Sequence, residues 1–233
     1  MLKAEIVKAR REFPIHVSLD LEQGSSVGLF GASGAGKSTI LACIAGIEEP
    51  DEGYIELDGV KLFPPPLPLH ERPLGYLTQE PALFPHLSVA QNVSFGIPAD
   101  EEKSHRDWIA TLRERLALAP LWNVPAAQIS GGQARRVGLA RMLARRPRLV
   151  LLDEPFAGLD RQHMRELIDD LVLWNQTMGF TMIAVDHQAE VLKRLCPSRA
   201  IVLERGQIVQ SGTWSELCSA PATPLLRSLL APL

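Results

Sequence analysis

The chain has 233 residues, of which 46% are hydrophobic and 22% are charged, and its formal net charge is −3. This balance is typical of one globular domain with a sizeable core, and it excludes a basic field over the whole molecule of the kind that binds nucleic acid. Three scattered cysteines exclude a disulfide framework and favour reduced intracellular thiols. The N-terminus lacks the apolar region of a secretory signal, and no apolar run is long enough to span a bilayer. We therefore expect a soluble chain that only another protein could hold at a membrane.

The N-terminal third predicts strands and hairpins. Residues 15–21 alternate between apolar and polar side chains, which is the period of a half-buried strand. The apolar run 27–30 leads into a glycine-rich loop and a helix that begins near Lys37. Asp58-Gly59 separates two apolar segments and predicts a hairpin turn. A cluster of prolines then predicts a stiff surface loop, with a docking motif for a proline-reading module as the alternative, at positions 64, 65, 66 and 68.

The rest of the chain alternates between strands and helices. A helical pattern extends from Ser88 to about Arg146, with Ser88 and Ser130 in N-cap positions. Strands that alternate with helices predict a parallel sheet with crossover connections, and the central helices are expected to form an inserted lobe. The other predicted elements are strands at 74–78, 149–152 and 180–185, helices at 162–176 and from about 189, and a terminal hairpin around Arg205-Gly206.

The glycine-rich loop satisfies the pattern G-x-x-x-x-G-K-[ST] between a strand and a helix. Its glycines let successive backbone N–H groups point inward at phosphate oxygens, and the helix N-terminus adds a partial positive charge. We expect Lys37 to reach the β- and γ-phosphates, Ser38 to ligate Mg²⁺ and Thr39 to contact the α-phosphate. A loop that merely turns the chain is the alternative. The loop consists of Gly31, Ala32, Ser33, Gly34, Ala35, Gly36, Lys37 and Ser38.

Two carboxylates follow the apolar segment 149–152. A phosphate loop alone is compatible with GTPases, kinases, helicases and transport ATPases. These carboxylates are a second element that narrows the class of enzyme. Asp153 is placed to hold Mg²⁺, through water, and Glu154 is placed to act as general base on the water that attacks the γ-phosphate. Acidic residues that merely end a strand are the alternative.

A second anion-binding helix N-terminus is predicted at residues 129–133, a serine cap and two glycines before a helix. A single chain does not need two anion-binding helix N-termini to bind one triphosphate. Two chains that face each other head to tail do need them, since each chain completes the other's site. Here the sequence resembles the ATP-binding cassette (ABC) family, whose signature peptide is Leu-Ser-Gly-Gly-Gln. Ile129 replaces the leucine, and the remaining signature residues are Ser130, Gly131, Gly132 and Gln133.

The resemblance implies roles for residues outside these peptides. Gln79 resembles the glutamine that senses Mg²⁺ and the attacking water, and would join Ser38 and Asp153 around the metal. The segment 156–160 resembles the one that crosses the dimer interface; Gly158 replaces its usual small polar residue, and Asp160 is kept.

Two further residues resemble family positions at the ends of the nucleotide. His187 resembles the switch histidine that contacts the γ-phosphate, although Asp186 precedes it where the family has Thr or Ser, which places a negative charge near the site. Phe13 is the candidate to stack on adenine, with a core phenylalanine as the alternative.

The resemblance covers residues from about 5 to about 214 and implies an α/β fold, a P-loop NTPase cassette with a RecA-like core, an antiparallel β subdomain and an inserted α-helical subdomain. We expect a single nucleotide-binding domain over 1–233, with the core and β lobe at about 1–86 and 147–233 and the helical lobe at about 87–146. No C-terminal regulatory domain is expected. The implied activity is hydrolysis of ATP with Mg²⁺ as cofactor.

The implied partners are a second copy of the chain, arranged head to tail around ATP, and separate transmembrane permease subunits. An exposed apolar segment with Leu83 and Phe84 would receive a coupling helix from the permease. The stretch 69–86 looks like importer ATPases for molybdate, sulfate and related oxyanions, which implies an extracytoplasmic substrate-binding protein and a peripheral location at the cytoplasmic face of the inner membrane. Two alternatives remain, a soluble ABC ATPase that acts on ribosomes or DNA and a binding module that does not hydrolyse ATP.

The densest basic cluster of the sequence is predicted to be a solvated face, matched to the dipole at the C-terminal end of the signature helix. A nucleic-acid patch is the alternative, and no nucleic-acid partner is expected. The cluster consists of Arg135, Arg136, Arg141, Arg145, Arg146 and Arg148.

Overall fold

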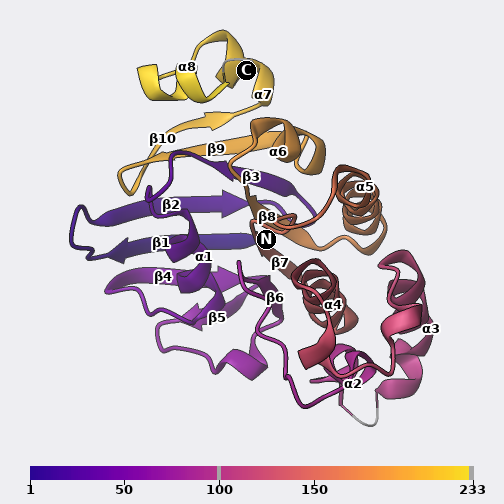
Figure 1. Ribbon diagram of the computed structural model, residues 1–233. Coiled ribbons are helices and arrows are strands. Elements are labelled where there is room, and N and C mark those ends of the chain that lie inside the picture. The colour runs from indigo at the N-terminus through magenta and orange to yellow at the C-terminus, as the bar shows by residue number, and fades with distance from the viewer. Residues whose placement is uncertain (99–100, 231–233) are drawn as a thin grey trace.

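The computed structural model describes residues 1–98 and 101–230 and contains one ten-stranded sheet, in the order β5-β4-β1-β2-β10-β9-β3-β8-β7-β6 (Figure 1). The strands are β1 (Leu2–Lys8), β2 (Ile15–Leu21), β3 (Ser26–Phe30), β4 (Glu52–Leu57), β5 (Val60–Phe63), β6 (Leu74–Leu77), β7 (Leu149–Asp153), β8 (Thr181–Val185), β9 (Arg199–Glu204) and β10 (Gln207–Gly212). The helices are α1 (Lys37–Ala45), α2 (Val89–Ser94), α3 (Glu102–Arg115), α4 (Gly131–Ala144), α5 (Arg161–Met178), α6 (Ala189–Leu195), α7 (Trp214–Ser219) and α8 (Pro224–Leu230).

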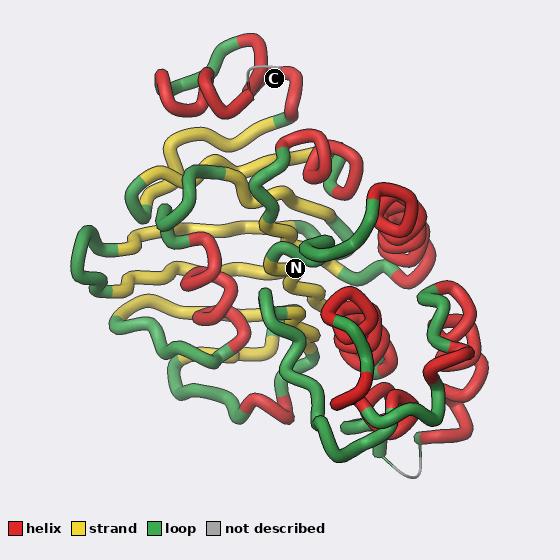
Figure 2. The backbone as a smooth tube through the Cα atoms, in the orientation of Figure 1, coloured by secondary structure: helices red, strands yellow, loops and turns green. Residues whose placement is uncertain are grey.

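One half of the sheet is parallel and covered on both faces, as the alternation of strands and helices predicts. Strands β9, β3, β8, β7 and β6 pair in parallel. Leu149 and Leu151 of β7 pack with α1, whereas Val150 and Leu152 pack with α4, α5 and α6 on the opposite face. Figures 1 and 2 show α1 on one face and these three helices together on the other. The predicted α/β P-loop fold is confirmed.

The other half of the sheet is antiparallel. Strand β1 pairs with β2 and β4, and β4 pairs with β5 across the Asp58-Gly59 turn. Both turn residues have positive φ, 49° and 81°, which is the geometry of a type I′ hairpin. Strand β1 and the terminal helices α7 and α8 are elements that the sequence reading missed.

The predicted helical stretch from 88 to 146 is interrupted. Helices α2, α3 and α4 are separated by irregular segments and short 3₁₀ turns at Ala119–Leu121 and Ala126–Gln128. Pro120 and Pro125 lie in the second segment, where their missing N–H groups prevent a continuous helix. Ser88 and Ser130 are N-caps, as predicted, and each forms a reciprocal capping box. No helix within residues 1–98 and 101–230 has both the length and the apolar character that a bilayer span needs.

Arg72 connects three segments near α1. Its side chain is 3% exposed and donates hydrogen bonds to the carbonyls of Leu67 at 2.9 Å, Ile44 at 2.9 Å and Leu62 at 3.0 Å. Gly46 leaves the space that the guanidinium fills, because a Cβ built there lies 2.3 Å from Arg72 Cζ. A single buried cation therefore satisfies carbonyls from α1, β5 and the proline-rich loop.

Replacing Arg72 with Ala is expected to lower the free energy of unfolding by about 3 kcal/mol, because three carbonyl acceptors lose a charged donor. Urea denaturation monitored by circular dichroism measures this loss. Arg145→Ala is the matched control, since the Arg145 side chain is exposed and, within the described residues, donates one hydrogen bond, to the carbonyl of His70 at 3.2 Å. The control is expected to change stability by less than about 0.5 kcal/mol. Equal losses in the two variants would contradict the assigned role of Arg72.

Candidate functional site

The phosphate loop occupies the turn between β3 and α1. Gly31 and Gly36 have φ of 149° and 106°, and a Cβ built at Gly31 lies 2.1 Å from the Leu203 carbonyl oxygen. Glycine is therefore required where the loop passes β9. Lys37 Nζ donates to the carbonyls of Gly31 and Ala32, each at 2.8 Å, so the loop closes around its own lysine. Burial lowers the pKa of Lys37, and the charges of Glu154 and Asp153 oppose this shift. Both carboxylates are thus within electrostatic range of the loop.

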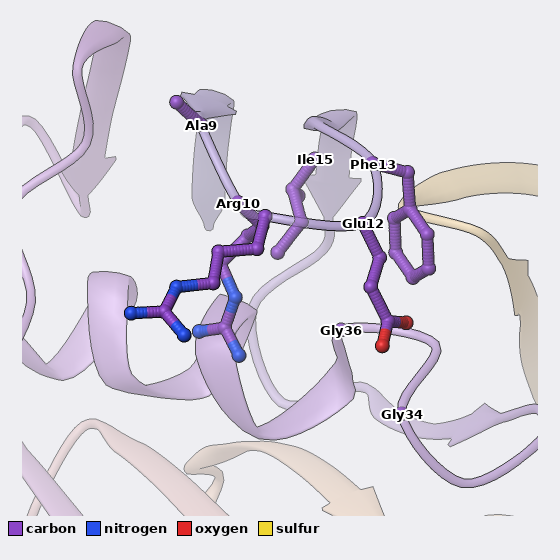
Figure 3. A pocket seen from close by; sticks show the side chains of 8 residues that line it. Ala9, Arg10, Glu12, Phe13, Ile15, Gly34 and Gly36 are labelled. Carbon is purple, nitrogen blue, oxygen red and sulfur yellow. The ribbon is translucent and has the colours of Figure 1, made fainter.

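A pocket of about 750 Å³ opens beside this loop and under the turn between β1 and β2. Phe13 is half-buried and lines the pocket with Gly34 and Gly36, so the structure brings this candidate next to the phosphate loop. Figure 3 shows Glu12 and Phe13 projecting from the turn toward the loop at Gly34 and Gly36.

Arg10 is a residue of this pocket that the sequence reading missed. Its Nη1 donates to Thr39 Oγ1 at 2.8 Å, and Thr39 is 6% exposed. The contact joins positions 29 residues apart. The only sequence signal for it is the pair of arginines that precedes Phe13.

Asp153 ends β7, and its two carboxylate oxygens differ in their hydrogen bonding. The residue is 2% exposed; the Tyr76 hydroxyl donates to Oδ2 at 3.4 Å, whereas Oδ1 is buried and accepts no hydrogen bond within the described residues. Burial raises the pKa of Asp153, and the nearby Ser38 hydroxyl opposes this rise. An orphaned carboxylate oxygen beside a serine hydroxyl is a donor set that suits Mg²⁺, so the residues present fit this metal.

Glu154 and His187 follow the neighbouring strands β7 and β8, and their side chains meet. His187 Nδ1 lies 3.2 Å from Glu154 Oε1. Glu154 has a φ of 50°, which is unusual for a residue with a side chain and is concentrated at functional sites. Asp186 is 5% exposed and accepts a hydrogen bond from Gln188 N at 2.8 Å, and burial raises its pKa. The unusual Asp186 thus shapes the turn between β8 and α6.

Arg135 contradicts the prediction of a fully solvated arginine face. It is 7% exposed, and its Nη1 donates to the Glu154 carbonyl at 2.7 Å while its Nη2 donates to the Gln79 carbonyl. Gln79 itself is exposed and lies just beyond β6. The helical period carries a signal for this burial, because Leu139 and Met142, four and seven residues further on, are also buried. Arg136 and Arg141 are half-buried, and Arg145, Arg146 and Arg148 are exposed.

The signature residues lie at the N-terminus of α4. Ser130 Oγ accepts from Gln133 N at 3.3 Å, and Gln133 Oε1 accepts from Ser130 N at 2.8 Å. Gly132 lies against the segment 156–160, because a Cβ built on it is 3.0 Å from the Gly158 carbonyl oxygen. Asp160 in that segment is the N-cap of α5 and accepts from Gln162 N and His163 N, both at 3.0 Å.

Residues 15–157 match the sequence profile of the family described as ABC transporter. The chain belongs to the ABC transporter family. It is therefore an ABC ATPase, a cassette that binds and hydrolyses ATP.

Individual proteins similar to this ABC ATPase agree with that assignment. The chain is 40% identical to the methionine import ATP-binding protein MetN of Thermobifida fusca over 93% of this chain and 68% of that protein. It is 37% identical to a probable sulfate/thiosulfate import ATP-binding protein, CysA of Chlorella vulgaris, over 92% of this chain and 90% of that protein. A solved structure of a dimeric ATP-binding cassette, in a post-hydrolysis state with ADP and Pi bound, is also similar to this chain. The two superpose with a TM-score of 0.78 at 26% sequence identity, over 91% of this chain and 98% of that chain.

Proposed function

We propose that this ABC ATPase binds MgATP on the loop 31–38 and hydrolyses it with Glu154 as the general base. The observation that supports this most directly is the contact between Glu154 and His187 within electrostatic range of Lys37. Strands β7 and β8 are adjacent and parallel, so their carboxyl ends deliver both side chains to one edge of the sheet, as expected for a ligand site in an open α/β sheet.

The loop and its neighbours bind the triphosphate in this proposal. Lys37 exchanges its two carbonyl partners for β- and γ-phosphate oxygens, and the N–H groups of residues 31–38 surround the phosphates. Ser38, Asp153 and Gln79 hold Mg²⁺, which when bound neutralises charge on the phosphate oxygens. Phe13 packs against the adenine in the neighbouring pocket, and Thr39 contacts the α-phosphate.

The carboxylate of Glu154 accepts the proton of the attacking water as the water approaches the γ-phosphate in line. His187 Nδ1 lies 3.2 Å from Glu154 Oε1 at the adjacent strand end, and in this proposal the histidine orients that carboxylate and contacts the γ-phosphate. Because phosphoryl transfer requires little covalent chemistry, holding these groups in position supplies most of the rate.

The signature residues act on the partner's nucleotide in this proposal. Helix α4 is 14 residues long, and its N-terminus provides free N–H groups and a partial positive charge for an anion. In a head-to-tail dimer, residues 130–133 of each chain cover the γ-phosphate held by the other, and Asp160 lies at the interface. The similar cassette bound to ADP and Pi is dimeric, which supports this arrangement.

A groove of about 640 Å³ is our proposed docking site for a transmembrane permease subunit. The sequence reading expected Leu83 and Phe84 to be exposed, but both are half-buried, because Leu83 packs on the core and Phe84 lies 4.2 Å from Phe95, ring centre to ring centre. The exposed apolar side chains of the groove are instead Ile47 at 59%, Leu69 at 56% and Phe95 at 50%. Such a patch suits an amphipathic helix of a partner.

The proposed biological role is import of a molybdate- or sulfate-like oxyanion, with an extracytoplasmic binding protein and the permease, at the cytoplasmic face of the inner membrane. The similarity to a probable sulfate/thiosulfate import protein over 90% of its length supports this substrate. The similarity to a methionine import protein makes methionine the solute to compare in the test.

Phe95→Asp is expected to abolish uptake of radiolabelled molybdate or sulfate in cells that carry this chain as their only copy, because a charge in the groove opposes docking of an apolar helix. The purified variant should keep ATP turnover within about twofold of the wild type, since Phe95 lies outside the nucleotide pocket. Leu173→Asp is the matched control, because Leu173 is also 50% exposed but lies on α5. Normal uptake with Phe95→Asp would exclude the groove as the docking site of the permease. Loss of methionine uptake without loss of molybdate or sulfate uptake would exclude an oxyanion as the transported solute.

A further inference from the structure

We propose that Arg135 is a positioning residue that fixes Glu154 and the loop at Gln79 to the helix that carries the signature peptide. This inference rests on the proposed role of Glu154 and extends it. Arg135 projects from α4, Glu154 follows β7 and Gln79 follows β6, so one side chain joins three elements.

The guanidinium is buried and directed at backbone atoms. Arg135 is 7% exposed, with Nη1 donating to the Glu154 carbonyl at 2.7 Å and Nη2 to the Gln79 carbonyl. A planar guanidinium offers several N–H donors in a rigid fork, so two acceptors in fixed positions hold it in one orientation. Burial lowers the pKa of Arg135, and the charges of Glu154 and Asp153 counteract this shift. Arginine side chains stay protonated in proteins, so a positive charge lies near the two carboxylates.

The backbone of Glu154 needs such support. Its φ of 50° lies in the left-handed region, where a Cβ is crowded against the backbone. The N–H of Glu154 donates to the Val185 carbonyl at 2.9 Å, and its own carbonyl accepts from Arg135. The Glu154 carbonyl also accepts from the Ala157 N–H at 3.3 Å, so among the described residues Arg135 provides one of three hydrogen bonds to the Glu154 backbone and the shorter of the two to its carbonyl. Without it, the peptide can relax and move the carboxylate away from the attacking water.

The same contact connects Glu154 to the partner's nucleotide through α4. Ser130 caps the first turn of α4, and Arg135 follows roughly 7.5 Å along the helix axis at the usual rise per residue. When the signature of one chain meets the γ-phosphate bound by the other, any shift of α4 is transmitted to Glu154 and Gln79 of its own chain. Correct placement of the base thereby depends on dimer closure.

The test compares Arg135→Ala and Arg135→Gln with Arg136→Ala, using the wild type and Glu154→Gln as references. Arg136 is the matched control, because it is the next residue of α4 and donates to a carbonyl outside the site, that of Leu116, at 3.0 Å. We measure kcat and KM for MgATP, equilibrium affinity for ATP and the melting temperature of each purified chain. Arg135→Ala is expected to lower kcat by about tenfold to a hundredfold with ATP affinity unchanged within about twofold.

Arg135→Gln is expected to retain more turnover than Arg135→Ala, since an amide can still donate to one of the two carbonyls and keeps more of the packing. Arg136→Ala should leave kcat within about twofold. Two results overturn the inference: wild-type kcat in both Arg135 variants, or a loss of kcat that Arg136→Ala reproduces at the same melting temperature. In either case, a Glu154→Gln variant without turnover still supports the proposed function. Normal turnover in Glu154→Gln instead removes the proposed function, and the role of Arg135 with it.

Discussion

Glu154→Gln is expected to reduce ATP turnover by at least about a hundredfold and to leave ATP affinity unchanged within about twofold, because the amide cannot accept the proton of the attacking water but preserves the shape of the side chain. The bound triphosphate then persists, and its γ-phosphate remains in contact with both chains of the dimer. The variant should elute as a dimer in size-exclusion chromatography with ATP and Mg²⁺, and as a monomer with ADP.

The matched control for this substitution is Glu166→Gln, which removes the same charge from an exposed position on α5. It should hydrolyse ATP at the wild-type rate and show no ATP-stabilised dimer beyond that of the wild type. Normal hydrolysis by Glu154→Gln would show that another group is the base. Loss of ATP binding in that variant would mean that Glu154 acts on binding and not on the chemical step.

Lys37→Ala is expected to weaken ATP binding by at least about a hundredfold, because it removes a charged donor to two phosphates from a half-buried position. The loop also loses the two hydrogen bonds, both of 2.8 Å, that Lys37 makes to its carbonyls. Isothermal titration with ATP measures the effect. Lys3→Ala on β1 is the control and should bind ATP like the wild type.

Lys37→Ala also tests the head-to-tail arrangement when it is mixed with Gly131→Asp. Gly131 is exposed and a Cβ there meets no atom within 4 Å, so an aspartate fits, yet its charge repels the γ-phosphate of the partner's nucleotide. Each variant alone should be inactive. A mixed dimer combines both defects in one composite site and leaves the other site intact, so random pairing should restore roughly a quarter of wild-type turnover.

The outcome of the mixing experiment separates two arrangements of the dimer. If the loop and the signature of the same chain served one site, every site in a mixed dimer would contain a defect and no activity would return. Gly131→Asn controls for the side chain without the charge, and it should retain more turnover than Gly131→Asp. Equal loss of turnover in Gly131→Asn and Gly131→Asp would show that the size of the side chain, and not its charge, disables the aspartate variant.

Most of the local structure that can be predicted from this sequence lies in short peptides. The hairpin at Asp58-Gly59 and the capping boxes at Ser88 and Ser130 depend on interactions within four residues, so sequence patterns report them directly. The apolar period after Ser88 predicts too continuous a helix, because it does not register the prolines at 120 and 125 that end regular helix between α3 and α4.

What the amino-acid sequence determined by itself is the set of contiguous motifs and hence the family, since each motif is built by backbone geometry over a few neighbouring residues. The tertiary structure alone decided which distant side chains meet: Arg10 on Thr39, Tyr76 on Asp153, and Arg135 on the carbonyls of Glu154 and Gln79. These contacts span 19 to 77 residues, and those of Tyr76 and Arg135 require β6 and β7 to be neighbours in the sheet. Local periodicity predicts that a residue is buried, but it does not predict which residues it contacts. Those contacts depend on strand order and register, which are set by packing of the whole core.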